Sequence, residues 1–177
     1  MATQDREVRL RFLAQPTDVN FGGKVYGGMV MKWIDQAGYA CAVSWSGKYC
    51  VTAAVGGIQF VQPIHIGDMV IVHCQLIYTG HTSMHFCVDV MARDLKTGND
   101  VLATHCVIVM VATDADGKPS PVPKWEPRSA DDKALAAYAS KLMELDRAIG
   151  QEVARYRDAA HLPQSGREKT ASVEAHS

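Results

Sequence analysis

The sequence has almost no net charge and no long apolar run, and each of these absences excludes a class of protein. Its 177 residues carry 18 Lys and Arg against 19 Asp and Glu. Because no basic field results, nucleic acid is not expected as a partner. No apolar run approaches the roughly 20 residues of a membrane-spanning helix, and the start "MATQDREVRL" has no basic and then apolar signal segment. We therefore predict a cytoplasmic protein with no membrane insertion.

Sequence motifs for metals, disulfides and nucleotides are also missing. The five cysteines have no CxxC spacing, and most lie in apolar runs, which predicts reduced, buried thiols. His81 and His85 are four residues apart, which on a strand separates them by about 13 Å. His73, His85 and His105 fall on different predicted strands, and nothing in the sequence indicates that they converge. The glycine-rich loop before residue 28 lacks both GxGxxG and the Walker lysine spacing. No metal and no cofactor is predicted.

The chain does contain the pattern of an antiparallel β-sheet with one buried helix. "REVRLRFL" alternates apolar and charged residues as a strand with one wet face does. A helix is predicted within 26–45, and four further strand-like runs follow it, at 50–62, 69–79, 82–93 and 101–113. Turn residues separate these runs, so we expect the four strands to form a meander. A twisted antiparallel sheet wrapped around one central helix, an α+β fold, satisfies this order with a single core.

The last predicted strand and the C-terminal third indicate how the outer face of the sheet is covered. Run 101–113 is apolar on both faces, with Ala103 and Val107 on one side and Cys106 and Ile108 on the other, so both faces should be covered. The central helix can cover only one of them. The other is expected to meet a second subunit or the chain's own C-terminal segment. Residues 1–123 are predicted to form the domain, 124–160 an amphipathic accessory helix, and 161–177 a disordered polar tail.

The helix within 26–45 begins without a capping side chain. The first amides of a helix have no acceptor inside it and are normally satisfied by Ser, Thr, Asp or Asn. Here the sequence is Tyr26-Gly27-Gly28. Bare amides at the positive end of the helix dipole are suited to stabilise an oxyanion, and glycine lets a ligand approach closely. The alternative is that the two glycines serve only a tight turn and close packing.

The same helix carries one carboxylate, Asp35, in an otherwise apolar stretch. It could pair with Lys32, or it could face a cavity as a general base or a nucleophile. Gly27 and Asp35 are eight residues apart, hence about 12 Å along one helix. They can act on one bond only if a second copy of the helix runs antiparallel beside the first. This spacing predicts at least a homodimer.

Four ordered stretches resemble the hotdog-fold acyl-CoA thioesterases: "NFGGKVYGGMVMKWIDQAG", "VTAAVGGIQFVQPIHIGDMV", "YTGHTSMHFCVDV" and "GKPSPVP". The resemblance covers about residues 6–123 and is nearest to the bacterial broad-range acyl-CoA hydrolases akin to brain-type cytosolic acyl-CoA hydrolase. It implies a hotdog fold and hydrolysis of acyl-CoA to free acid and CoA, without metal or redox cofactor. It also implies dimers with antiparallel helices, which often assemble into hexamers as trimers of dimers.

The resemblance implies roles for individual residues. Asp35 matches the catalytic carboxylate, Gly27 the oxyanion amide, and Asn20 an amide side chain that places the water or the thioester. The strands that begin near Gly56 and Thr82 flank the pantetheine in this family. The expected substrate-binding residues are therefore Gly28, Gly56, Gly57, Thr82 and Ser83.

Three positions depart from the family pattern. Gly56 stands where an Asp is common, and His81 and Ser120 stand where Arg is usual. The last two changes remove expected contacts to the CoA phosphates. His81, Arg93, Lys118 and Lys48 are candidates to replace them.

Two other functions fit the same fold. A hydroxyacyl-thioester dehydratase would use a histidine near the helix, but Tyr26 and Asp35 occupy those places. A non-catalytic acyl-CoA sensor or scaffold would keep the pocket without turnover. Such a binder would gain little from an unpaired carboxylate at position 35.

Overall fold

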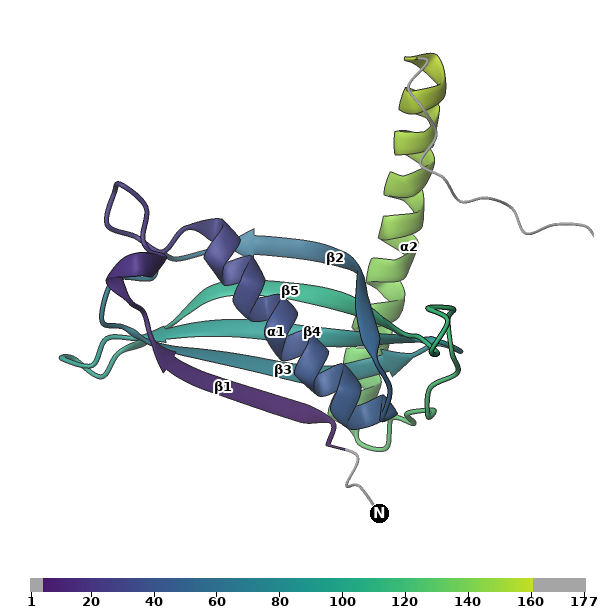
Figure 1. Cartoon of the computed structure of the whole chain (residues 1–177), viewed down its shortest axis with the longest axis horizontal. Helices are drawn as coiled ribbons and strands as arrows, with labels where there is room; N and C mark the ends of the chain where they lie inside the picture. Colours follow the sequence, from purple (N-terminus) through teal and green to yellow (C-terminus); the bar gives the residue numbers. More distant parts are fainter. Residues whose placement is uncertain (1–4, 161–177) are drawn as a thin grey trace, which may run out of the picture. The chain divides into compact units, whose positions relative to one another are not determined.

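A five-stranded antiparallel sheet crossed by one long helix forms most of the protein (Figure 1). The computed structural model describes residues 5–160. Its strands are β1 (Glu7–Leu13), β2 (Cys50–Phe60), β3 (Met69–Thr79), β4 (Ser83–Arg93) and β5 (Asp100–Ala112). The helices are α1 (Gly27–Ser46), a short 3-10 turn η1 (Pro16–Asp18) and α2 (Ala130–Ala159). The predicted α+β hotdog architecture is confirmed, while the predicted tail at 161–177 lies outside the described residues.

The strand order corrects one expectation. The order is β1-β3-β4-β5-β2, so β3, β4 and β5 form the predicted meander but β2 pairs with β5 at the far edge. Residues 61–68 are therefore not a tight turn. They carry the chain from one edge of the sheet to beyond β4, a crossing of about 14 Å at the usual strand spacing. Eight residues are long enough for this crossing.

α1 packs across one face of the sheet and forms the main core with it. Its buried residues are Val30, Trp33, Ile34, Ala37, Gly38, Cys41, Ala42 and Trp45. Phe12 of β1 packs against Trp33 with ring centroids 4.7 Å apart. Gly38 lets the helix approach closely, because a Cβ at this position would lie 3.0 Å from Ile108 on β5. The helix ends at Gly47, whose φ of 67° closes a left-handed C-cap.

The opposite face of the sheet has a smaller core of its own. Ile77 of β3 and Val107 of β5 pack against Ala139 of α2, and Leu135, Tyr138 and Leu142 surround them. The chain's own C-terminal helix thus covers this face, one of the two outcomes expected. A bulge near Ala103 reverses the alternation there, so Ala103 packs in the main core rather than on the side of Val107.

The chain divides into a unit Met1–Leu142 and a unit Met143–Ser177. In the second unit, α2 continues to Ala159 and exposes Leu145, Ile149, Val153 and Tyr156 at the three- and four-residue spacing of one helix face. Residues 124–129, expected within the accessory helix, precede it without regular secondary structure.

The start of α2 is fixed by Asp132. Its carboxylate accepts hydrogen bonds from the backbone N–H of Ser129 (3.2 Å) and Arg128 (3.1 Å) and pairs with Arg6 at 2.7 Å. Arg6 lies over the ring of Trp125, 4.8 Å from its centroid. These N–H donors and then Arg6 lower the pKa of Asp132 to about 2.

We expect replacement of Gly38 by Val to lower the free energy of unfolding by about 1–3 kcal/mol, because the added methyls would meet Ile108. The matched control is Gly150→Val, where an added Cβ meets nothing within 4 Å. That change should stay within about 0.5 kcal/mol of wild type. Urea unfolding of both variants measures the difference, and equal midpoints would contradict the close helix–sheet contact.

We also expect the stabilisation contributed by Asp132 to depend on pH. A depressed folded pKa means that the carboxylate stabilises the fold above its ordinary pKa, and that this contribution fades as pH falls toward about 2. Urea midpoints of wild type and Asp132→Asn should therefore converge as the pH falls from about 5 to about 2. Asp131→Asn, an exposed neighbour in the same turn, is the control and should track wild type. A gap that is constant with pH would rule out the ionised anchor.

Candidate active site

The start of α1 presents amides that the rest of the described chain leaves free. Tyr26 is the N-cap and makes no side-chain capping bond, while its carbonyl accepts the N–H of Met29 at 2.9 Å. Within residues 5–160, neither Gly27 N–H nor Gly28 N–H has a hydrogen-bond acceptor. The predicted bare helix start is therefore present in the fold. It directs two donors and the positive end of the helix dipole outward.

A pocket of about 390 Å³ opens beside Gly27. Its apolar lining includes Val25, Val30, Phe60, Val61 and Ile64. The ring of Phe60 is so close that a Cβ on Gly27 would lie 3.4 Å from it. A carbonyl bound to the Gly27 amide would thus have an apolar cavity next to it.

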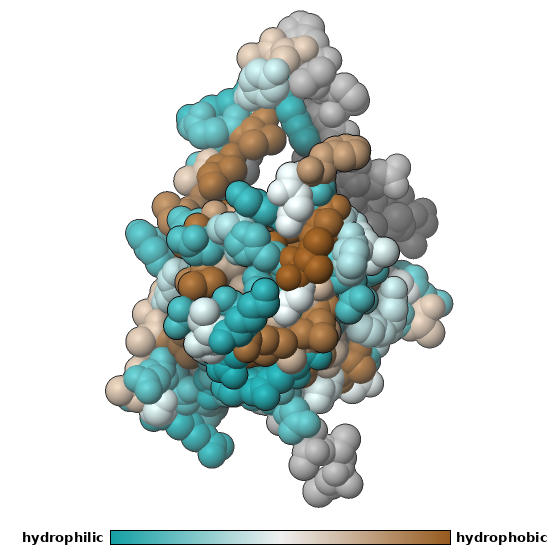
Figure 2. Space-filling model, turned by 90° about the vertical axis from the view of Figure 1, so that its left-hand side faces the viewer, coloured by the Kyte–Doolittle hydropathy of each residue, from teal (hydrophilic) through white to brown (hydrophobic). Residues whose placement is uncertain are grey.

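A second hollow of about 560 Å³ adjoins the first, since Gln62 and Pro63 line both. Ile66, Leu95 and Val101 contribute its exposed apolar side chains. Figure 2 views the molecule from this end and shows hydrophobic side chains breaking through a polar surface.

Asn20 lies in the loop that leads to α1. Its side-chain oxygen accepts the N–H of Gly22 (2.9 Å) and of Lys24 (3.3 Å). Its carbonyl accepts the N–H of Gly23, and its own N–H donates to Lys24. These bonds fix the loop and use the oxygen of the side chain. The NH₂ group is what Asn20 can offer to a ligand.

Asp35 is exposed on α1, so the helix that was predicted to be buried is not buried on every side. Lys32, Gln36 and Tyr39 lie on the same outward side of the helix, so α1 is apolar on one face only. Within the described residues Asp35 makes no ion pair with Lys32. Its carboxylate instead accepts a short hydrogen bond from the hydroxyl of Thr52 on β2.

Thr52 contacts a predicted site residue and was not identified from the sequence. It lies on the edge strand β2, 17 residues after Asp35, and its hydroxyl orients the carboxylate. Only a correct pairing of α1 with β2 would have identified it, because no sequence spacing relates a helix to a strand that packs beside it.

The remaining predicted binding residues separate into two groups at opposite ends of the sheet. His81 and Thr82 lie in the turn before β4, Ser83 is the first residue of that strand, and Lys118 lies in the loop after β5. The two segments are joined, since Val122 N–H donates to the His81 carbonyl and Ala112 N–H donates to the Thr82 carbonyl. The Lys48 ammonium donates hydrogen bonds to the Ser120 hydroxyl and to the Pro121 carbonyl, both at 2.7 Å, and these bonds fix the segment that follows Lys118.

Arg93 lies at the other end of β4, ten residues from Ser83 and hence about 34 Å away. Its guanidinium forms a bidentate pair with Asp100, at 2.5 and 2.6 Å, which raises the pKa of Arg93 and lowers that of Asp100. The fold therefore does not bring Arg93 together with Lys118 in one chain. Gly56 and Gly57 lie mid-strand in β2, where Gly57 adopts a left-handed φ of 61°.

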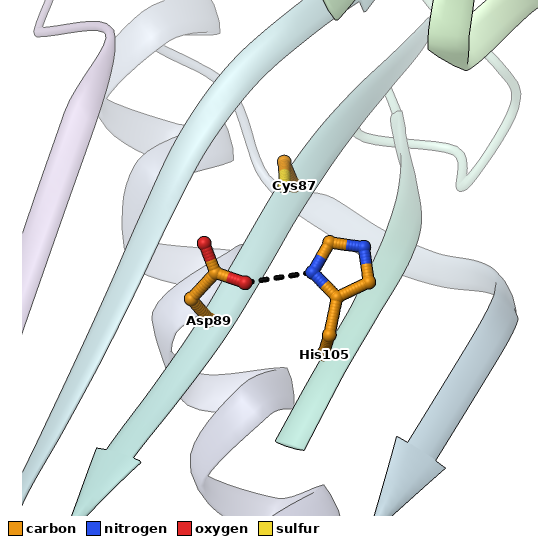
Figure 3. A group of neighbouring side chains, drawn as sticks. All are labelled: Cys87, Asp89 and His105. Carbon is orange, nitrogen blue, oxygen red and sulfur yellow. Dashed lines mark hydrogen bonds and ion pairs between the residues drawn. The ribbon is translucent and has the colours of Figure 1, made fainter. Parts of the chain in front are cut away.

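His73 and His105 both lie opposite Asp89 in the strand pairing, but their side chains have different partners. His73 bonds Glu7 at 3.1 Å, whereas His105 bonds Asp89 at 2.7 Å. One group within residues 5–160 has ligand atoms close enough to hold a metal, namely Cys87, Asp89 and His105 (Figure 3). It lies on the face of the sheet opposite α1, away from Asp35.

No helix in the described part of the chain is both long and apolar enough to cross a membrane. All five cysteines are free thiols. Burial raises the pKa of Cys106 to about 12 and raises that of Cys50 as well. These thiols are poor nucleophiles at neutral pH.

Comparison with known proteins gives a consistent family. Residues 22–99 match the family described as the thioesterase superfamily. The acyl-CoA thioester hydrolase YciA of Salmonella typhimurium is 33% identical over 124 residues, which cover 68% of this chain and 93% of that protein.

Solved structures agree with this result. A hexameric acyl-CoA thioesterase is 31% identical, with a TM-score of 0.78 over 82% of this chain and 93% of that one. An acyl-CoA hydrolase from Staphylococcus aureus, solved with butyryl-CoA, CoA and CoA disulfide, is 26% identical, with a TM-score of 0.79 over 88% and 95% of the two chains. Two further structures of that hydrolase replace an aspartate or an asparagine by alanine, and these positions are 15 residues apart.

Proposed function

The chain belongs to the thioesterase superfamily, and we propose that it hydrolyses acyl-CoA thioesters to the free acid and CoA. The observation that carries this proposal is the unsatisfied Gly27 amide beside an apolar pocket, on the same helix as an outward-facing carboxylate. A thioester carbonyl is electrophilic and its thiolate leaves readily. One oxyanion donor and one carboxylate are therefore sufficient machinery.

Gly27, Asp35 and Asn20 have the catalytic roles. The Gly27 N–H donates to the thioester carbonyl oxygen and stabilises the negative charge that develops there. Asp35 either takes a proton from the attacking water or attacks the carbonyl itself. The C–S bond then breaks, and the departing thiolate of CoA takes up a proton, which in the base route is the one that Asp35 took from the water. In the nucleophilic route, water then hydrolyses the acyl–Asp35 anhydride, which releases the free acid and restores the carboxylate. The NH₂ group of Asn20, in the loop before Gly27, positions the water or the thioester. Asn20 and Asp35 are 15 residues apart, the spacing of the two residues replaced in the S. aureus hydrolase.

Thr52 has a positioning role. Its hydroxyl bonds Asp35 Oδ1, which holds this carboxylate oxygen against β2.

The site is completed by a second copy of the chain. Within one α1, Gly27 and Asp35 are about 12 Å apart, too far to act on one carbonyl. In a dimer with antiparallel α1 helices, the Gly27 of one subunit faces the Asp35 of its partner. In the same dimer, the end of one sheet next to Gly27 and Gly28 lies beside the opposite end of the partner's sheet. That opposite end carries His81, Thr82, Ser83 and Lys118.

This juxtaposition supports a CoA site shared between subunits. His81 and Lys118 supply positive charge for the phosphates, while Thr82, Ser83, Gly56 and Gly57 contact the pantetheine. Because Arg93 is at the opposite end of its own sheet, it can reach the CoA only from the subunit that supplies Gly27. Hexameric relatives support a trimer of such dimers as the full assembly. We propose that the enzyme works in the cytoplasm without a metal or redox cofactor in the reaction, and its five free thiols support a reducing compartment.

We expect Asp35→Asn to lower kcat for acyl-CoA hydrolysis by at least about 100-fold, as for loss of a general base. Thiol release from acetyl-, butyryl-, hexanoyl- and palmitoyl-CoA measures the rate. Gln36→Glu, a change of similar size on the same outward face, is the control and should retain activity. Unchanged turnover in Asp35→Asn would reject its assignment, and binding of CoA esters without turnover by wild type would favour the sensor. A single turnover in ¹⁸O-water labels the Asp35 carboxylate only if it acts as the nucleophile.

The shared site predicts complementation between two inactive variants. Asp35→Asn and Gly27→Leu should each be inactive alone, because one lacks the carboxylate and the other blocks the amide. Unfolded together and refolded, they should recover about a quarter of wild-type activity, since half the dimers are mixed and each mixed dimer has one intact site. Refolding of Asp35→Asn with Thr52→Val is the control, as both changes fall in the same half-site. Failure of the first pair, with both chains found in one oligomer, would place the whole site within a subunit.

A further inference from the structure

The face of the sheet opposite α1 carries a compact group of metal-binding side chains that the proposed reaction does not use. Asp89 of β4 lies directly opposite His105 of β5 in the strand pairing. Cys87 is two residues before Asp89 and therefore on the same face. The Sγ of Cys87, a carboxylate oxygen of Asp89 and a ring nitrogen of His105 all lie within 4.8 Å of one another. Figure 3 shows the three side chains converging between the two strands.

The imidazole of His105 is held from both sides. Its Nδ1 is 2.7 Å from Asp89 Oδ1, and its Nε2 is 2.9 Å from the hydroxyl oxygen of Tyr138 on α2. The His105 and Asp89 side chains are 26% and 39% exposed, so an ion can reach them from solvent. The site is thus ordered and accessible.

We propose that Cys87, Asp89 and His105 bind a divalent cation of the zinc class. A thiolate, an imidazole and a carboxylate together form a ligand set typical of Zn²⁺, and three protein ligands leave the fourth position to water. Bond lengths of about 2.0–2.3 Å place tetrahedral ligand atoms about 3.5 Å apart. The observed group needs to contract by only about 1 Å, within the range of side-chain rotation on two fixed strands.

Tyr138 allows the imidazole of His105 to change its tautomer without losing a hydrogen bond. In the metal-free protein the neutral imidazole is satisfied when Nδ1–H donates to Asp89 and the Tyr138 hydroxyl donates to Nε2. Metal binding at Nδ1 requires the other tautomer. Nε2–H then donates to the Tyr138 oxygen, which can accept as readily as it donates. A metal-binding histidine usually donates its second N–H in this way.

Binding also requires the Cys87 thiolate. Burial, and then the nearby Asp89 charge, raise the pKa of Cys87 to about 12 in the absence of a cation. A bound dication reverses this effect, and the thiol proton passes to solvent. Each metal ion therefore displaces the thiol proton, and the apparent affinity should fall as the pH is lowered.

The site is separate from the proposed reaction, because it lies on the outer face of the sheet and Asp35 lies beside the inner one. It departs from the expectation from the sequence, which contained no recognisable metal spacing and predicted no metal. The ion would join β4 to β5 and, through His105 and Tyr138, would link both strands to the first part of α2.

Titration of the chelator-treated full-length protein with Co²⁺ tests the proposal. We expect one Co²⁺ per chain, with a near-ultraviolet band for charge transfer from thiolate to cobalt, and loss of this band on addition of Zn²⁺. In weakly buffered solution near neutral pH, one proton should be released per ion bound. Cys87→Ser should lose the charge-transfer band, and Tyr138→Phe, which removes the support of His105, should lower affinity about tenfold.

His73→Asn is the matched control for His105→Asn. His73 lies on the neighbouring strand opposite Asp89, but it bonds Glu7 and is not one of the three ligands. His73→Asn should bind Co²⁺ as wild type does, and His105→Asn should not. If Cys87→Ser does not fold, Asp89→Asn provides the second test, with an expected loss of at least about tenfold in affinity. Absence of the thiolate band in wild type, or its retention in Cys87→Ser, would overturn the proposal and leave the group as a hydrogen-bonded tether of α2.

Discussion

The close packing of α1 against the sheet determines where the chemistry of this protein can occur. Gly38 brings the helix backbone near Ile108, and Trp33, Ile34 and Cys41 fill the space between helix and strands. Once that face is buried, Asp35 must point outward, and the first turn of the helix must lie at the rim of the sheet beside Phe60. Both functional groups are therefore presented by one rigid element, about 12 Å apart along it.

In the proposed mechanism, this rigidity is also the reason that one chain alone does not form a complete site. Neither the helix start nor the carboxylate can move to the other without breaking the core. Only a second copy can bring the missing group into reach, and the outward face of α1, with Asp35 and Tyr39, is the part of the helix left free to meet it. The same constraint explains how candidate CoA residues at both ends of the sheet could contribute to one site. In an antiparallel dimer, one end of a sheet lies beside the opposite end of the partner's sheet.

The sequence predicted the positions of the helices and strands along the chain better than it predicted which strands pair. Alternation and turn residues placed all five strands within a few residues, because a period of two is a local property of the chain. The place of β2 beside β5 was missed, since pairing depends on the path of residues 61–68 and not on their composition. The bare helix start at Gly27 was predicted because capping is local as well. The exposure of Asp35 and its bond to Thr52 were not, because both depend on how α1 sits on the sheet.

The two faces of the sheet illustrate a general asymmetry in such predictions. The inner core was evident from the apolar helix, whereas the outer core under α2 was inferred only from a strand that is apolar on both sides. Cys87 and His105 lie on that outer face, on different strands, so no spacing in the sequence relates them. They become a group only because β4 and β5 pair in one register, with Asp89 opposite His105. A one-residue shift of that register would send His105 to the inner face and dissolve the cluster while leaving every sequence motif intact.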